Sequence, residues 1–381
     1  MNVFAAMLLD SYRELNSKKL FWITLILSGL VVAVFGMIGI TDKGLKIIVW
    51  EFPIDLFNAN VISPATFYKL VYNNLGVKIW LAWAATILAL ISTAGMIPDF
   101  IAGGAIELTL SKPVGRARLL LTKFVTCLLF TALQVTVFAT AAFLLIGIRG
   151  GAWIPDVFLA VPIIVLFYSY LFCVCTLIGV ITRSTIAALL ITILFWLAMF
   201  GLNSTDTIMV ALRSNSELRI EALEARIARM EKNTTTELEK TRDPATPEPT
   251  YTQAQLDAAN PLLPGRRSKL AEEQDSLRTW QRWTTILYVT KTILPKTSET
   301  IEVLERRMIS QADIAGLVER DEGVRIRNDD SDDIRVSDSA RAQKAEDEFR
   351  SRPLWWIIGT SLGFEAVILG IATLIFCRRD F

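Results

Sequence analysis

The sequence predicts an all-α polytopic membrane protein, with six transmembrane helices and a large, mainly helical extracytoplasmic insertion between helices five and six. Of the 381 residues, 52% are hydrophobic and the mean hydropathy is +0.44, values that soluble domains rarely reach. The apolar residues form runs of about 20, the length of helix that crosses a hydrocarbon core about 30 Å thick. One long polar stretch, residues 203–353, separates the last two runs.

The positions of these runs define the expected spans. Each run must be helical, because hydrocarbon offers no partner to an unpaired backbone amide. The first run is too long for a cleavable signal peptide and lacks a small-x-small cleavage site. The runs lie near residues 20–40, 79–97, 122–148, 157–181, 185–202 and 354–377.

Basic residues beside the spans set the expected orientation. If successive helices alternate in direction, one side receives Arg13, Lys18, Lys19, Lys112, Arg116, Arg118, Lys123, Arg183, Arg378 and Arg379. Short loops rich in Lys and Arg remain in the cytoplasm. Both termini are therefore expected in the cytoplasm, and residues 203–353 on the other side of the membrane.

The insertion is predicted to begin as an antiparallel helical hairpin. Residues 207–240 place apolar side chains on a rough stripe among Glu and Arg, which is typical of a solvated helix. Five prolines between residues 241 and 264 indicate a linker, and a second helix is expected from Ser268 to about Leu294. We also expect a small β-hairpin within 324–337.

An amphipathic segment runs from Ile293 to Met308. The sequence leaves two interpretations open: a helix on the outer membrane surface, or part of the insertion's own core. The residues Asp329, Asp330, Asp332 and Asp333 are interpreted as an acidic turn, because the glycine and distal glutamate of a calcium-binding loop are missing.

Several function classes are excluded by what the composition lacks. The chain has no histidine, which removes Ser-His-Asp and Cys-His catalysis and nearly all zinc sites. Its four cysteines lie in or beside apolar runs, so no metal site is predicted and the insertion has no disulfide. A net charge of +1 gives no sign of nucleic-acid binding.

Glu365 and Gln134 are the candidate polar sites inside the expected spans. Glu365 lies near the middle of the sixth span, where a carboxylate is costly and often functional. Gln134 lies at a similar depth in the third span and is its candidate partner. Two interpretations of Glu365 stay open: a structural hydrogen bond, or a role in the substrate path or in coupling.

The expected cytoplasmic loop, residues 98–123, carries the most specific pattern. A short amphipathic helix is expected to stop at Lys112 and Pro113, since the residue before proline avoids the helical region. The stretch from Glu107 to Pro113, followed by Gly115 and Arg116, resembles the segment between the second and third helices of type-2 ABC transporter permeases. An amphipathic cytoplasmic helix at 1–19, six spans and a large outer loop match that family too; the insertion at 203–292 is longer than in its small members.

The resemblance implies a permease subunit of an exporter. It would work as a homodimer or a paired permease in a bacterial inner membrane and bind a cytoplasmic ABC ATPase. It also implies the residues that meet the ATPase: Glu107, Leu110, Ser111, Lys112, Pro113 and Arg116. The chain lacks the G-x-x-x-x-G-K-[ST] phosphate loop, so ATP would bind only to the partner and the chain itself is not an enzyme.

Other functions remain alternatives. The chain could be a membrane-anchored scaffold that recruits extracytoplasmic partners without transport. The hairpin at 207–290 is expected to contact an extracytoplasmic protein or the other protomer. An intramembrane enzyme has the least support, because Glu365 has no acidic companion in the spans.

Overall fold

The computed structural model describes residue 13 and residues 19–41, 44–47, 50–53, 62–102, 115–240, 251–309 and 338–379. The chain divides into two compact units, each described here by itself. Unit 1 comprises Met1–Gly201, Lys291–Arg320 and Pro353–Phe381, and unit 2 comprises Leu202–Thr290 and Asp321–Arg352.

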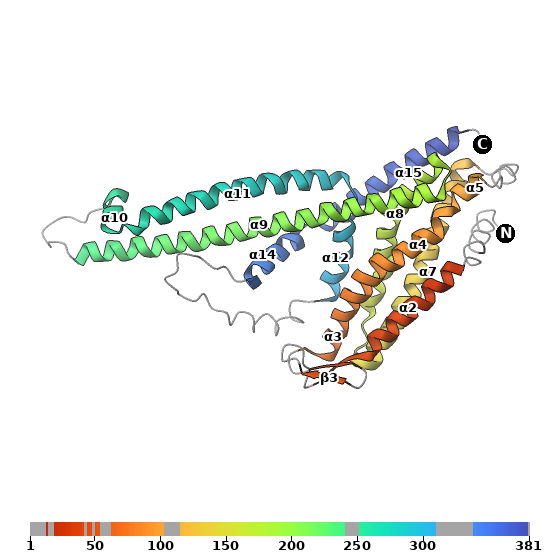
Figure 1. Ribbon diagram of the computed structural model, residues 1–381, viewed down its shortest axis with the longest axis horizontal. Coiled ribbons are helices and arrows are strands. Elements are labelled where there is room, and N and C mark those ends of the chain that lie inside the picture. Colours follow the sequence, from red (N-terminus) through yellow and green to blue (C-terminus); the bar gives the residue numbers. More distant parts are fainter. Residues whose placement is uncertain are drawn as a thin grey trace. The chain divides into compact units, whose positions relative to one another are not determined.

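Six helices in the described chain are long and apolar enough to cross a membrane (Figure 1). Their number and order agree with the six predicted spans and with a multi-pass, largely helical membrane protein. They are α2 (Lys19–Met37), the composite helix Pro64–Ile101, α7 (Arg116–Gly150), η3 and α8 (Pro155–Thr182), α9 (Thr185–Lys240), and η4 and α15 (Trp355–Arg378).

The second helix begins earlier than its apolar run predicts. Ser63 caps it: the Thr66 amide donates to the Ser63 Oγ at 3.1 Å, and Pro64 occupies the first turn, where a missing N–H costs nothing. Polar residues such as Asn73 and Lys78 lower the hydropathy of this first part, although Asn73 is fully buried. The helix consists of α3 (Pro64–Val71), the π-helix η1 (Tyr72–Ala85), α4 (Thr86–Thr93), the 3₁₀ turn η2 (Ala94–Met96) and α5 (Pro98–Ala102).

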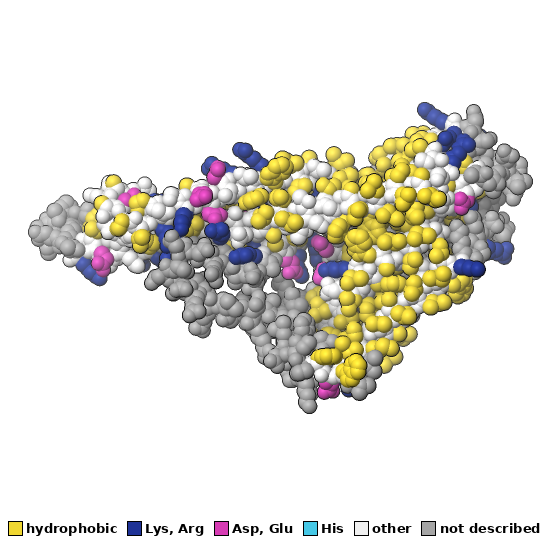
Figure 2. Space-filling model, viewed as in Figure 1, with side chains coloured by type: hydrophobic (Ala, Val, Ile, Leu, Met, Phe, Trp, Pro, Cys, Tyr) yellow, Lys and Arg dark blue, Asp and Glu magenta, His cyan; other side chains and the backbone are white. Residues whose placement is uncertain are grey.

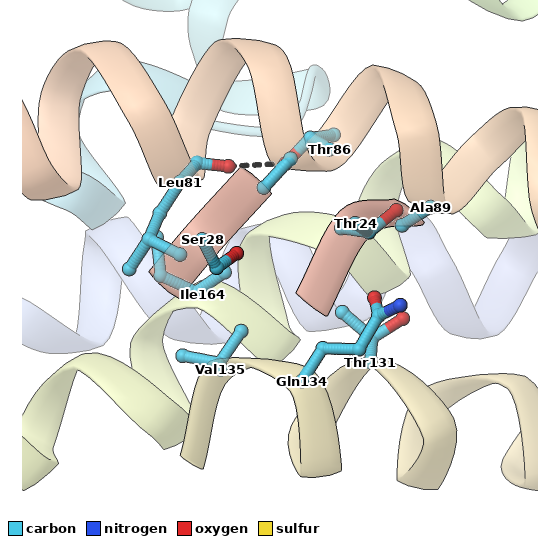
Figure 3. A pocket seen from close by; sticks show the side chains of 10 residues that line it. Thr24, Ser28, Leu81, Thr86, Ala89, Thr131, Gln134, Val135 and Ile164 are labelled. Atoms are coloured by element: carbon cyan, nitrogen blue, oxygen red, sulfur yellow. Dashed lines mark hydrogen bonds between the residues drawn. The ribbon is translucent and has the colours of Figure 1, made fainter. Parts of the chain in front are cut away.

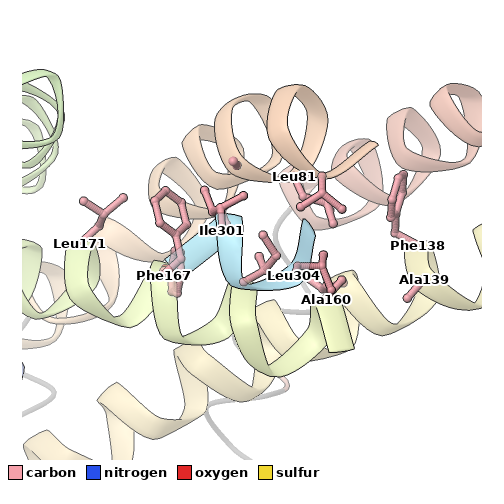
Figure 4. Close-up of a cluster of buried hydrophobic side chains, with 14 of the residues drawn as sticks. Leu81, Phe138, Ala139, Ala160, Phe167, Leu171, Ile301 and Leu304 are labelled. Atoms are coloured by element: carbon pink, nitrogen blue, oxygen red, sulfur yellow. The ribbon is translucent and has the colours of Figure 1, made fainter. Parts of the chain in front are cut away.

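Helix α8 lies at the centre of unit 1. It packs against α7, α15 and α12 (Thr297–Met308). Phe167 and Leu171 of α8 lie in one cluster with Ile301 and Leu304 of α12 (Figure 4). The outward surface is equally apolar (Figure 2), with Leu194 65% exposed. Apolar cover on this scale is what lipid contact requires and what a soluble domain avoids.

A small antiparallel sheet accompanies the largely helical fold. Strands β1 (Ile38–Thr41), β2 (Gly44–Ile47) and β3 (Trp50–Pro53) pair in that order, with Thr41 opposite Gly44 and Ile47 opposite Trp50. The Tyr68 hydroxyl donates to the Ile38 carbonyl at 3.0 Å, which ties β1 to α3. Ile38 and Ile40 of β1 and Ile47 of β2 are β-branched residues, which favour extended backbone.

Unit 2 is built on an antiparallel pair formed by the second part of α9 and α11 (Leu262–Ile293), with α10 (Gln253–Ala259) between them (Figure 1). Ile227, Leu256 and Leu263 make a small core. Arg267 bonds to Glu231 at 2.6 Å and to Asp257 at 2.7 Å. Helix α14 (Asp338–Ser351) also belongs to this unit.

The amphipathic segment after Ile293 is not part of the insertion's own core. It forms α12, and its apolar face, made by Ile301, Leu304 and Met308, is part of the main core of unit 1. Sequence analysis assigned this segment to the insertion at 203–353, whereas its contacts are with α8 and η1. The expected helix at 1–19, apart from residues 13 and 19, and the expected elements at 241–250 and 324–337 lie outside the described residues.

Candidate functional site

One end of unit 1 is a cluster of helix termini and basic residues, here called the basic end and defined by Arg116, Lys123 and Arg379. A separate apolar cluster holds four helix segments together there. Its buried members come from the start of α5, from α7, α8 and α15. They are Ile97, Ile101, Leu120, Val180, Ala372 and Phe376.

Polar contacts join the helix ends across this cluster. The Arg116 guanidinium donates to the carbonyls of Cys377 at 3.2 Å and Arg379 at 2.8 Å. Arg379 in turn donates to the Ile181 carbonyl at 3.0 Å, at the end of α8. Because helix C-termini leave carbonyls unpaired and partially negative, these arginines satisfy them and fix α7, α8 and α15 together.

The start of α9 is held in the same way. The Thr185 hydroxyl donates to the Asp99 Oδ1 at 2.8 Å, which links α9 to α5. A Cβ added at Gly179 would lie 3.1 Å from Pro98 Cγ, so α8 and α5 approach as closely as glycine permits. The Lys123 ammonium lies 4.7 Å from the Phe100 ring centre, a distance at which cation–π attraction acts.

The six expected ATPase-contact residues divide into two groups. Glu107, Leu110, Ser111, Lys112 and Pro113 lie outside the described residues. Arg116 is the first residue of α7 and holds the C-terminal carbonyls described above. Both flanks of residues 103–114 are thus fixed in one packed cluster, with α5 on one side and α7 on the other.

Glu365 and Gln134 do not contact each other. The Ser169 hydroxyl of α8 donates to Glu365 Oε2 at 2.8 Å. Gln134 instead lines a small cavity together with Thr24, Ser28 and Thr131 (Figure 3). The expected partnership is therefore replaced by an α8–α15 hydrogen bond, because the two side chains project from their helices toward different neighbours.

A buried charged cluster, which sequence reasoning missed, lies where α11 ends and α12 begins. Lys296 is fully buried. Its ammonium donates to the carbonyls of Thr292 at 3.0 Å and Leu294 at 3.1 Å and to the Thr360 hydroxyl. The ammonium also lies 4.7 Å from the Trp356 ring centre. We call this group, with the buried ion pair Lys291–Glu299, the Lys296 cluster.

Two carboxylates of α12 extend the charge pattern toward η1. Glu305 pairs with Lys78 at 2.7 Å. Burial, reinforced by the negative charge of Glu299, raises the pKa of Glu302 to about 7. Burial lowers the pKa of Lys296 to about 8, against the opposing effect of Glu299. Both groups therefore change charge near neutral pH.

The Lys296 cluster and Glu365 share the same two helices. The backbone amide of Lys296 donates to the Ser361 Oγ at 3.0 Å, one turn before Glu365 on α15. Tyr170, next to Ser169 on α8, is fully buried in the same region. A row of polar groups thus extends along the α8–α15 contact to α12. In the sequence, the signal for this row of polar groups was the presence of Lys and Glu within an otherwise apolar, threonine-rich stretch.

The described residues contain no group of three or more His, Cys, Asp or Glu side chains arranged to hold a metal ion. The site consists of contacts between helices: the packed basic end, the polar contact between α8 and α15, and the Lys296 cluster, which holds α12. Comparison with known proteins found no matching family model, no matching curated protein and no matching solved structure.

Proposed function

We propose that this chain is the permease subunit of an ABC-type exporter, and that it forms the membrane pathway and is driven by a separate cytoplasmic ATPase. The observation that carries the proposal is the loop at 98–123. Its motif resembles the ATPase-contact segment of type-2 permeases, and both of its flanks join the packed helix ends of unit 1. A partner that displaces a loop held at both ends in this way would also displace the helices to which the loop is joined.

The basic end connects the loop to three of the spanning helices. Arg116 joins α7 to the last turn of α15, and Arg379 joins that turn to α8. Movement of the loop would shift α7 and α15 together against α8. The Ser169–Glu365 hydrogen bond lies on the same helix contact, so it would be strained or exchanged during the cycle.

The proposal includes a location and an assembly. The basic end would face the cytoplasm of a bacterial cell with both termini, and the α9–α11 hairpin would lie on the extracytoplasmic side. Two copies, or one copy and a related permease, would form the pathway and bind the ATPase pair. ATP would be held by the partner subunits alone.

The first test is co-purification of the ATPase in mild detergent. Glu107→Ala/Lys112→Ala changes the loop and leaves Arg116, which has a structural role, in place. The matched control is Lys46→Ala/Glu51→Ala, which removes an exposed ion pair of 3.7 Å in the sheet. We expect a soluble ATPase with the wild type and the control, and its loss with the loop variant.

Retention of the ATPase by the loop variant would contradict the assignment of 98–123 as the contact site. Absence of any ATPase from the wild-type preparation would contradict the transport proposal itself. A control variant that also loses the ATPase would point to general loss of folding.

A second candidate function has one observation in its favour. The far part of the hairpin carries exposed charged residues around a small core of its own, a surface suited to a soluble extracytoplasmic partner. As a scaffold, the protein would lose its partner when residues 214–281 are replaced by a short Gly-Ser linker. The exporter proposal instead expects that variant to lose transport and to retain the ATPase.

A further inference from the structure

The two ends of the α9–α11 hairpin have opposite surface chemistry. In the far part, apolar side chains such as Leu223, Ile227 and Leu263 are buried, and exposed positions include Glu224 and Arg229. This is the pattern of a helix pair in water. The near part, which consists of residues 202–212 of α9 and 283–293 of α11, shows the reverse and is called here the hairpin base.

On the α11 side of the hairpin base, apolar residues face outward. Trp283, Ile286 and Val289 are 52–58% exposed. They recur at three-residue spacing, and the stripe continues to Ile293 at the end of the helix, which is 73% exposed. The fully buried positions of the same segment, Thr284 and Lys291, are polar and lie on the opposite helix face.

The α9 side shows part of this inversion, although Val210 is buried as well. Asn203 and Asp206 are buried, and Asp206 bonds to Arg352 at 2.9 Å. Ile208 is 57% exposed and Leu212 36%. The ion pair Arg219–Glu273 fixes the antiparallel alignment of the two helices. When the two helices are followed from that pair, Ile208 lies opposite Thr284. The exposed apolar segments of α9 and α11 therefore lie side by side.

We propose that the hairpin base is embedded in the membrane interface, with its outward stripe in contact with lipid. Exposure of this stripe to water would cost about 1.5–3 kcal/mol of free energy per large side chain, relative to burial in an apolar environment. Trp283 and Tyr288 are the residue types that gather where acyl chains meet headgroups. Exposed Arg278 and Arg282 follow at the water side, where phosphate groups attract them.

The dimensions fit one leaflet. Eleven residues from Trp283 to Ile293 extend about 16 Å as helix, close to half of a hydrocarbon core about 30 Å thick. The only charge in that stretch is Lys291, which is buried and paired with Glu299. The inference needs no assumption about transport, so it can hold even if the exporter proposal fails.

The test uses spin labels at single introduced cysteines, with the purified protein in nanodiscs of phosphatidylcholine and phosphatidylglycerol. Cys377→Ser is the background, since Cys127, Cys173 and Cys175 are at most 1% exposed. Labels are placed with Ile286→Cys and Val289→Cys. Leu194→Cys, on the apolar part of α9, is the lipid reference, and Ala228→Cys, exposed on the far hairpin, is the water reference.

We expect an oxygen-to-nickel collision ratio at residues 286 and 289 well above that at residue 228 and close to that at residue 194. A ratio equal to that at 228 would place the hairpin base in water and overturn the proposal. Low collision rates with both reagents, together with dipolar broadening between labels, would also overturn it and indicate a second copy of the chain on this face.

Discussion

At the residue scale, the buried charges differ in how completely they are compensated. Lys296 finds two carbonyls, a hydroxyl and an aromatic ring. Lys291 and Glu299 compensate each other. Glu302 has less support, because its nearest strong influences are burial and a second carboxylate. The charged form of Glu302 is therefore the one that the fold tolerates least.

The raised pKa of Glu302 predicts a pH dependence of stability. Its pKa rises from 4.5 to about 7 in the folded protein, so the folded state holds this proton more tightly than the unfolded state. Its contribution is present below pH 4.5 and is lost as the pH rises through 7. We expect Glu302→Gln to raise the apparent melting temperature in detergent at pH 8 relative to wild type, equivalent to about 1–3 kcal/mol, with little change at pH 4.5.

The control is Glu221→Gln, at an exposed position of the hairpin, which should leave the pH profile unchanged. Parallel melting curves for wild type and Glu302→Gln across this range would refute the assignment.

The buried pair Asp206–Arg352 gives a second residue-scale prediction. Both side chains are at most 8% exposed and bond at 2.9 Å. Removal of one partner leaves an uncompensated buried charge, so Asp206→Leu should destabilise unit 2 by about 3–5 kcal/mol. The double variant Asp206→Leu/Arg352→Met should recover most of that loss. Hydrogen exchange of peptides from α14 and the adjoining part of α9 measures the loss of stability and its recovery. Equal exchange in the single and double variants would contradict a stabilising role for the Asp206–Arg352 pair.

At the element scale, close helix contacts decide how the basic end holds the loop. A Cβ at Gly179 of α8 would lie 3.1 Å from Pro98 at the start of α5, so a larger side chain there must push against α5. Helices packed in this way transmit displacement, because well-packed contacts have little free space.

Gly179→Val is therefore expected to move α5 and weaken ATPase co-purification several-fold while the chain still inserts into the membrane. Gly370→Val is the matched control, because nothing lies within 4 Å of a Cβ at that position of α15. Normal ATPase recovery with Gly179→Val would show that the α5–α8 contact does not govern the loop.

At the scale of the whole molecule, the charge distribution predicts the orientation. Basic residues gather at the helix ends around Arg116 and Arg379, and the hairpin leaves the last residue of α9, Lys240, exposed. In a Cys377→Ser background, Lys240→Cys should react with a membrane-impermeant maleimide in cells with a permeabilised outer membrane. Arg183→Cys, in the turn between α8 and α9, should react only after the inner membrane is opened. The reverse result would invert the proposed topology.

Much of the architecture could be predicted from local sequence patterns. Hydropathy located six apolar helices, because each is a continuous run of apolar residues. The start at Pro64 was missed, because a buried Asn73 looks polar in a hydropathy window. The small sheet of β1, β2 and β3 was missed, because β1 directly follows the apolar run of α2.

The sequence by itself determined which segments are apolar enough to span a membrane, because hydropathy is a property of neighbouring residues. Only the tertiary structure decided that Glu365 meets Ser169 and not Gln134, that α12 lies in the core, and that Lys296 is enclosed. These contacts join residues far apart in the chain, 196 positions in the case of Ser169 and Glu365. Such a partner depends on how helices pack and rotate against one another, which a pattern within one helix does not specify.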